Sequence, residues 1–304
     1  KFRVKVYVAF NTLLFDSEMD DALNMIWQIF HTGADALIIQ DMGLLELDLP
    51  PIPLHASTQA NNVTPEHIQF LEAAGFSRVI LARELSLPEI SAIRQLTTVP
   101  LECFVHGSLC VSYSGQCYLS HAVGNRSANR GECAQPCRLT YNLVDGNNRI
   151  LVQDKHLLSL RDLNLSEYVP QLIQAGATSL KIEGRLKDET YVANVVSYYR
   201  QIIDDFMENN RDFRKSSLGT VTTAFTPDPE KTFNRKYSQY FIHNRSTQDI
   251  SAMDTPKSMG KRMGVITKVT AGYAEIDAAE PFRNGDGICF LTADGQLQGT
   301  YINE

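Results

Sequence analysis

Short apolar runs alternate with longer amphipathic segments over the first two thirds of the chain. Each apolar run is rich in Val, Ile, Leu or Phe and is too short for a typical helix, which favours a buried strand. The predicted strands are Val4–Phe10, Ala36–Gln40, Leu54–Thr58, Arg78–Ala82, Leu101–His106 and Ser179–Ile182.

The segments between these strands carry apolar residues at helical spacing. Ile26, Trp27 and Phe30 illustrate this pattern in the first segment. Thr64 followed by Pro65 is typical of a helix start, because threonine caps the first turn and proline fits its first position. The predicted helices are Glu18–His31, Pro65–Ala74, Pro88–Leu96, Leu165–Ala175 and Asp188–Asn209.

Continuous apolar strands separated by helices predict an α/β fold with a parallel sheet. Six βα units follow one another, whereas a closed (β/α) TIM-type barrel has eight. We therefore expect a barrel that lacks its first two units, which agrees with a chain that begins at Lys1 directly before a strand. An open doubly wound sheet is the alternative, although no glycine-rich phosphate loop follows any strand.

The last part of the chain has a different pattern. Residues 216–256 are polar and read as a linker, and residues 257–304 read as a small, incomplete β domain of antiparallel strands. Asn284-Gly285 and Asp294-Gly295 predict turns between those strands. The domain organisation is thus a βα barrel over 1–215, carrying a cysteine-rich loop at 108–160, followed by the linker and the β domain.

Four of the six cysteines lie in one polar stretch, with six, fifteen and three residues between them. They are Cys110, Cys117, Cys133 and Cys137. Buried cysteines, disulfides, a zinc site and an iron–sulfur cluster are the alternatives for such a set. Structural zinc sites usually bring two close pairs, and only Cys133 and Cys137 form one, so the spacing favours a cluster. Cys103 and Cys289 lie on predicted strands and are expected in the core.

Net charge and hydropathy limit the partners. The 304-residue chain carries a formal charge of −7, and no apolar run is long enough to span a membrane. Nucleic-acid binding would need a local basic patch. Residues 108–150 have a net charge of +2, and a second small patch contains Lys257, Lys261 and Arg262.

Polar residues recur where the predicted strands end, which is where barrel enzymes carry their sites. Any one of them has an ordinary explanation: His55 and His106 as core histidines, and Glu183 with Arg185 as a surface ion pair. Together they predict a site at one end of the barrel. The set is Asn11, Thr12, Gln40, Asp41, His55, Ser57, Gln59, Asn61, Arg83, Glu84, His106, Glu183 and Arg185.

Three long motifs, FVHGSLCVSYSGQCYLS, NRGECAQPCR and LKIEGRLKDETYV, closely resemble signatures of the collagenase-like "peptidase U" family. The resemblance extends over essentially the whole chain, and SANRGECAQPCR, KHLLSL and EKTFNRKYSQYFIHNR are most similar to the branch that forms 5-hydroxycytidine in 23S ribosomal RNA. It implies a cytoplasmic RNA hydroxylase acting on 23S rRNA or its precursor, with a 4Fe–4S cluster on Cys110, Cys117, Cys133 and Cys137. It also implies prephenate as a linked metabolite.

On this interpretation Arg83 and Arg185 hold the carboxylate of a small metabolite, because guanidinium groups match carboxylates. His106 or Glu183 would transfer a proton, with His55 a further candidate catalytic residue. A hydroxylase of wobble uridine in tRNA, a collagenase-like peptidase and a non-catalytic, metal-stabilised RNA-binding module are the alternatives. The sequence contains neither of the peptidase motifs HExxH and GxSxG. A peptidase would therefore have Cys110 as its only evident nucleophile and His106 as its only evident base.

Overall fold

A parallel sheet forms the centre of the computed structural model, which describes residues 4–216, 220–292 and 296–303. Its six parallel strands pair in chain order. They are β1 (Tyr7–Phe10), β2 (Ala36–Ile39), β3 (Leu54–Ala56), β4 (Arg78–Ile80), β5 (Leu101–Gly107) and β9 (Ala177–Ile182). Every residue of β2 and β5 is buried, which explains why these strands read as continuous apolar runs. The prediction of a mixed α/β fold with a parallel sheet is confirmed.

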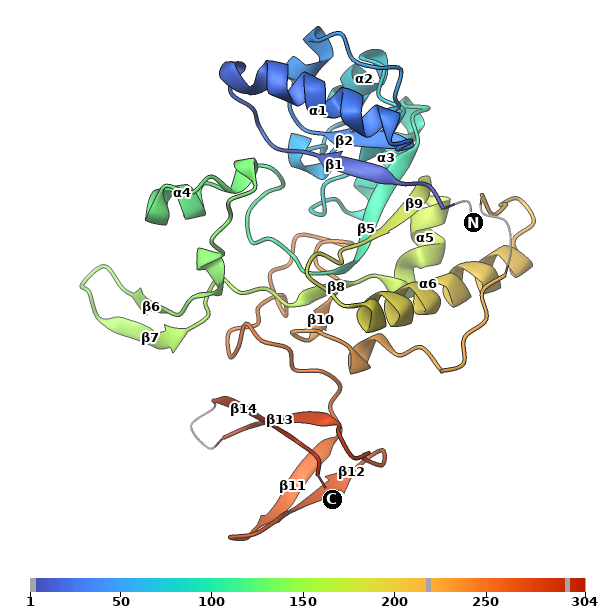
Figure 1. Ribbon diagram of the computed structural model, residues 1–304. Helices are drawn as coiled ribbons and strands as arrows, with labels where there is room; N and C mark the ends of the chain where they lie inside the picture. Colours follow the sequence, from blue (N-terminus) through green and yellow to red (C-terminus); the bar gives the residue numbers. More distant parts are fainter. Residues whose placement is uncertain (1–3, 217–219, 293–295, 304) are drawn as a thin grey trace.

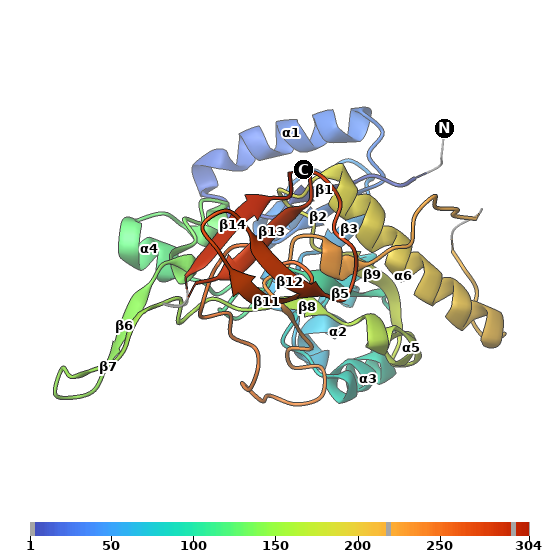
Figure 2. The ribbon, with the colours of Figure 1, turned by 90° about the horizontal axis from the view of Figure 1, so that it is seen from below.

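Five helices of the described chain lie around the outside of these strands (Figure 2). They are α1 (Met19–His31), α2 (Pro65–Ala73), α3 (Leu87–Leu96), α5 (Val169–Gln174) and α6 (Glu189–Asn209). Each buries an apolar stripe in the common core, for example Ile68 and Leu71 of α2. The predicted cap is present, since the Thr64 hydroxyl accepts a hydrogen bond from the His67 N–H at the start of α2.

The sheet is open, and the predicted TIM-type barrel is not confirmed. Among the described residues, β1 pairs only with β2, and no pairing joins β1 to β9. Two further strands extend the sheet instead. The strand β8 (Asp162–Asn164) pairs antiparallel with the end of β5, and β10 (Tyr237–Ser238) pairs parallel with β8. These strands have three and two residues, which is too short to produce a recognisable pattern in the sequence.

The segment predicted as a linker packs against this end of the sheet. It contributes β10 and buries Asn234, Arg235, Ile242 and Thr255. The short 3₁₀ turns of the chain lie mainly in such connections. They are η1 (Asp16–Glu18), η2 (Met42–Glu46), η3 (Thr58–Ala60), η4 (Ala128–Arg130), η5 (Pro136–Arg138), η6 (Ser166–Tyr168) and η7 (Pro229–Lys231).

Two antiparallel hairpins form the last part of the chain and lie apart from the sheet in Figure 1. They pair β11 (Gly264–Val269) with β12 (Ala274–Ala278), and β13 (Gly287–Leu291) with β14 (Leu297–Tyr301). The predicted turn at Asp294-Gly295 lies outside the described residues. Cys289, expected in the core, is exposed, because a two-stranded hairpin leaves most of its surface in water.

No helix in the part of the chain that the structure describes combines the length and apolar character that crossing a membrane requires.

Candidate functional site

The cysteine-rich loop lies over the ends of several parallel strands. Its first half is attached beyond β4, where the backbone N–H and hydroxyl of Ser114 both donate to the buried carboxylate of Glu84. Gly115 has a positive φ of 73° and lies so close to the Gln59 carbonyl that a Cβ would overlap it. Further along, the Leu13 N–H donates to the Asn129 carbonyl over 3.0 Å. The loop therefore contacts the connections after β1, β3 and β4.

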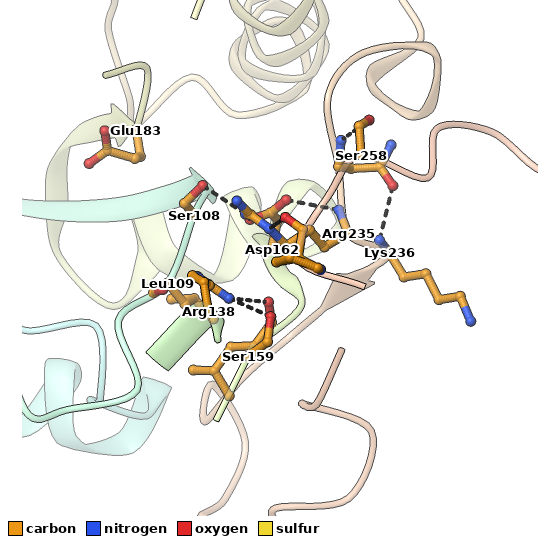
Figure 3. Close-up of polar contacts among 12 residues, drawn as sticks. Ser108, Leu109, Arg138, Ser159, Asp162, Glu183, Arg235, Lys236 and Ser258 are labelled. Atoms are coloured by element: carbon orange, nitrogen blue, oxygen red, sulfur yellow. Dashed lines mark hydrogen bonds and ion pairs between the residues drawn. The ribbon is translucent and has the colours of Figure 1, made fainter. Parts of the chain in front are cut away.

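Arg138 closes the loop at its other end (Figure 3). Its guanidinium donates to the Leu109 carbonyl over 2.9 Å and to the Ser159 hydroxyl over 2.8 Å. Between these anchors lie α4 (Leu119–Gly124) and a hairpin of β6 (Tyr141–Val144) and β7 (Ile150–Lys155), which projects away from the sheet in Figure 1. Because Leu109 precedes Cys110 and Arg138 follows Cys137, this side chain brings the first and last cysteines of the loop toward each other.

The four loop cysteines are free thiols in one neighbourhood. Burial raises the pKa of Cys110, and nearby Cys117 and Cys137 raise it further, whereas Arg83 opposes the shift. Burial likewise raises the pKa of Cys137, with Cys117 and Cys133 adding to the effect. Among the described residues, however, no three His, Cys, Asp or Glu side chains already converge as metal ligands. The donor type and proximity of the thiols fit a soft-metal centre, but the side chains must turn toward one another to bind it.

Arg83 and Glu183 form an ion pair across the ends of β4 and β9. The Arg83 Nη2 lies 3.2 Å from Glu183 Oε2, and the guanidinium stacks 3.8 Å from the centre of the Phe104 ring. Burial lowers the pKa of Arg83, which Glu183 and Cys110 partly oppose. The other carboxylate oxygen of Glu183 accepts the Arg185 N–H over 2.9 Å. Since Arg83 is already paired and stacked, it is poorly placed to hold a second carboxylate, contrary to the expectation from the sequence.

His106 is a buried residue with both ring nitrogens occupied. Its Nδ1 lies 3.3 Å from the Tyr199 hydroxyl, and its Nε2 lies 3.3 Å from the Tyr237 hydroxyl. Burial lowers the pKa of His106 to about 4, so it is neutral at neutral pH. The geometry favours the core-histidine alternative over proton transfer to a substrate. It also leaves His106 unavailable to activate Cys110 as a peptidase would require.

His55 lies deeper in the sheet and packs edge-on against the Tyr7 ring, with centroids 4.7 Å apart. Its neighbours are the ion pair of Arg78 with Glu102, whose Nη1 and Oε2 are 2.9 Å apart, and Lys181. Burial, followed by Arg78, lowers the pKa of His55 to about 4. His55 therefore belongs to a polar cluster inside the sheet, separate from the strand ends. Arg185 is exposed on the loop after β9.

A second polar group at the strand ends was not predicted (Figure 3). Asp162, at the start of β8, is buried and accepts from Arg235 Nη1 over 2.9 Å and from the Arg235 N–H over 2.9 Å. The same Arg235 Nη1 donates to the Ser108 hydroxyl directly after β5. Lys187, on the β9–α6 loop, lies close enough for Asp162 to influence its pKa. Lys187 and Arg235 lie within family-like motifs of the sequence, which was the one available signal for them.

Three side chains of the basic patches predicted for nucleic-acid binding form ion pairs within the protein. Arg130 forms an ion pair with Glu18 over 2.7 Å, and Arg149 pairs with Asp145. In the second patch, Lys261 bridges Asp228 and Glu280, which connects the end of the first β hairpin to the start of η7. Arg130 and Lys261 thereby hold segments of the chain together, whereas Arg149 pairs within its own hairpin.

Comparison with known proteins identifies the family. The model of peptidase family U32 matches residues 1–252. This chain belongs to peptidase family U32. It is 47% identical over 291 residues to the Escherichia coli 23S rRNA 5-hydroxycytidine synthase, covering 96% of this chain and 44% of that protein. The family resemblance inferred from the motifs is thereby confirmed.

Other U32 relatives have different names. A tRNA hydroxylation protein of Bacillus subtilis is 35% identical over 222 residues, which is 70% of this chain and 53% of that protein. A collagenase of Porphyromonas gingivalis is 30% identical over 227 residues, 69% of this chain and 54% of the relative. The chain spans about half the length of the curated relatives it matches.

Proposed function

We propose that this U32 chain carries the core of a cytoplasmic RNA hydroxylase that forms 5-hydroxycytidine in 23S rRNA. The main support is its 47% identity, over nearly its whole length, with a protein of that name. Named tRNA hydroxylation proteins are also similar to it, at lower identity. RNA hydroxylation is therefore the activity class that the relatives favour, and 23S rRNA is the substrate favoured within that class.

We infer that Cys110, Cys117, Cys133 and Cys137 hold a 4Fe–4S cluster, with zinc as the alternative occupant. Support comes from the four free thiols that share one neighbourhood and from Arg138, which ties Leu109 to the segment after Cys137. Such a cluster, when bound, supplies electron transfer. The loop that carries these cysteines lies over the strand ends, and Cys110 lies close enough to Arg83 to affect its pKa, so the centre would lie near the Arg83–Glu183 pair.

Glu183 is the proposed proton-transfer residue, in preference to His106. Its side chain is 27% exposed, whereas His106 is enclosed by tyrosines. Arg83 positions one carboxylate oxygen and the Arg185 N–H the other, which fixes the direction of the proton-accepting atoms. The target base would have to leave its stack to reach this recessed position. Arg185 is exposed and free to contact the RNA or the prephenate co-substrate.

The peptidase alternative has less support. A cysteine nucleophile needs an adjacent base, and both ring nitrogens of His106 are bonded to tyrosine hydroxyls instead. A structural metal in an RNA-binding module would explain the cysteines but would give the Arg83–Glu183 pair no chemical role.

Mass spectrometry of ribosomal RNA from cells lacking this protein tests the proposal. We expect one cytidine of 23S rRNA to lose one oxygen atom and the wild-type protein to restore it. The Glu183→Gln variant should bind iron but fail to restore the oxygen atom on this cytidine. The control variant Glu189→Gln, at an exposed position in the first turn of α6, should restore it fully. If the rRNA of these cells is unchanged but the wobble uridine of their tRNA lacks a hydroxyl group, the protein is instead a tRNA hydroxylase.

A further inference from the structure

Two positively charged side chains share one aromatic ring at the strand ends. The Lys187 Nζ lies 3.1 Å from the centre of the Phe233 ring, and the Arg235 Cζ lies 4.8 Å from the same centre. An aromatic face attracts a cation, but two cations on one ring repel each other unless negative charge is nearby. Negative charge is therefore needed close to Lys187 and Arg235.

Asp162 is the carboxylate that neutralises Arg235. It accepts from Arg235 Nη1, while Arg235 Nε donates to the Pro256 carbonyl over 2.6 Å. Within the described residues, Arg235 Nη2 donates to no acceptor, and Lys187 Nζ has neither a hydrogen bond nor an ion pair. Lys187 is half-buried. Lys187 therefore has no direct ion-pair partner among the described residues, although Asp162, Glu183 and Asp188 lie close enough to affect its pKa.

Arg138 adds a third positive charge nearby. Its hydrogen bonds go to the neutral acceptors Leu109 O, Ser159 Oγ and Leu160 O. Arg138 lies close enough to Arg235 for the two positive charges to repel each other. Burial lowers the pKa of Lys187 and Arg235 adds to this shift, whereas Asp162, Glu183 and Asp188 oppose it. Of these three positive side chains, Arg235 has a direct carboxylate partner, Asp162, whereas Lys187 and Arg138 have none among the described residues.

We propose that Lys187 Nζ and Arg235 Nη2 form a binding site for an oxyanion, occupied by the carboxylate of a small co-substrate. The occupant's identity as prephenate rests on the proposed function, whereas the oxyanion site itself does not. Arg235 Nη2 offers its N–H groups to one oxygen of a carboxylate, and Lys187 adds a point charge. Arg83, the residue expected in this role, is engaged by Glu183. An RNA phosphate has similar chemistry, but a half-buried site between the ends of β5 and β9 suits a small molecule better.

Calorimetric titration with three probes tests this site. The probes are prephenate, inorganic phosphate and a single-stranded RNA oligonucleotide. Lys187→Gln should weaken prephenate binding about tenfold or more, as expected for loss of a charge-assisted hydrogen bond, and Lys187→Arg should largely retain it. Lys236→Gln is the matched control, because Lys236 is exposed and its side chain points away from Asp162 (Figure 3). Equal unfolding temperatures of the variants would show that their folds are intact.

The outcomes separate the two proposals. If prephenate fails to bind but phosphate binds in a Lys187-dependent way, the oxyanion site is supported and the co-substrate assignment is overturned. If only RNA binding depends on Lys187, a backbone phosphate replaces the proposed carboxylate. If Lys187→Gln binds every probe as tightly as the wild-type protein, the site itself is overturned.

Discussion

The parallel sheet and the cysteine-rich loop are built by opposite means. All seven residues of β5 are buried, whereas in the loop Cys133 and the hairpin residues Ile150 and Leu151 are exposed. The sheet is stabilised by many apolar contacts spread over its strands. The loop is held at separate points by polar anchors, such as Ser114 on Glu84 and Arg138 on Leu109.

This difference in packing suits the sheet and the loop to different roles in the proposed site. A densely packed sheet holds Arg83 and Glu183 in fixed positions, because interior packing resists movement. A loop with few apolar contacts can rearrange, which a set of thiols needs if it is to close around a bound group. The loop therefore supplies adaptable ligands above a rigid set of strand ends.

The largest expected effect is on the loop. Cys133→Ser should reduce bound iron in anaerobically prepared protein to near zero, because a hydroxyl is a poor replacement for a soft thiolate ligand. Iron content and visible absorbance measure this. Cys289→Ser is the matched control, since Cys289 is also exposed but lies on β13, far from the loop in sequence. Equal iron in both variants would contradict the assignment.

The next largest expected effect is a difference in the free energy of unfolding between a substitution in the sheet and a substitution in the loop. Leu101→Ala, at a fully buried position of β5, should lower the free energy of unfolding by about 2–5 kcal/mol. Ile150→Ala, on the 51% exposed side chain of β7, should change it by less than about 0.5 kcal/mol. Urea titration measures both. A cost for Ile150→Ala as large as for Leu101→Ala would refute the distinction drawn between these regions.

A smaller expected effect is a loss of stability at acidic pH, caused by His106 of β5. The pKa of His106 is about 4 in the folded protein and about 6.5 when unfolded, so the unfolded state binds more protons between these values. Stability is therefore complete above pH 6.5 and falls as the pH drops toward 4. Moving from pH 7 to pH 5 should cost about 2 kcal/mol through His106.

Urea titration of the wild-type protein and His106→Gln at pH 7 and pH 5 measures this contribution. The variant should show a loss smaller by about that amount, because glutamine does not titrate. His55, whose pKa is also about 4, retains its own contribution in both proteins. An equal loss in both would mean that His106 is not buried as a neutral residue.

The periodicity of the chain determined the parallel strands and their helices, because burial on both faces requires long apolar runs and amphipathic helices. The boundaries of α1, α2 and α6 differ from the predicted ones by a residue. The motifs likewise identified the peptidase family.

Tertiary structure alone decided how polar side chains pair. The sequence places His106 and Arg83 at strand ends, but only packing shows that tyrosines enclose the first and that Glu183 engages the second. It also decided that β8 and β10 extend an open sheet, because strands of two or three residues are stabilised by their neighbours and not by their own pattern. The local sequence pattern shows which residues are buried, whereas the pairing of residues that are distant in the chain depends on the tertiary structure.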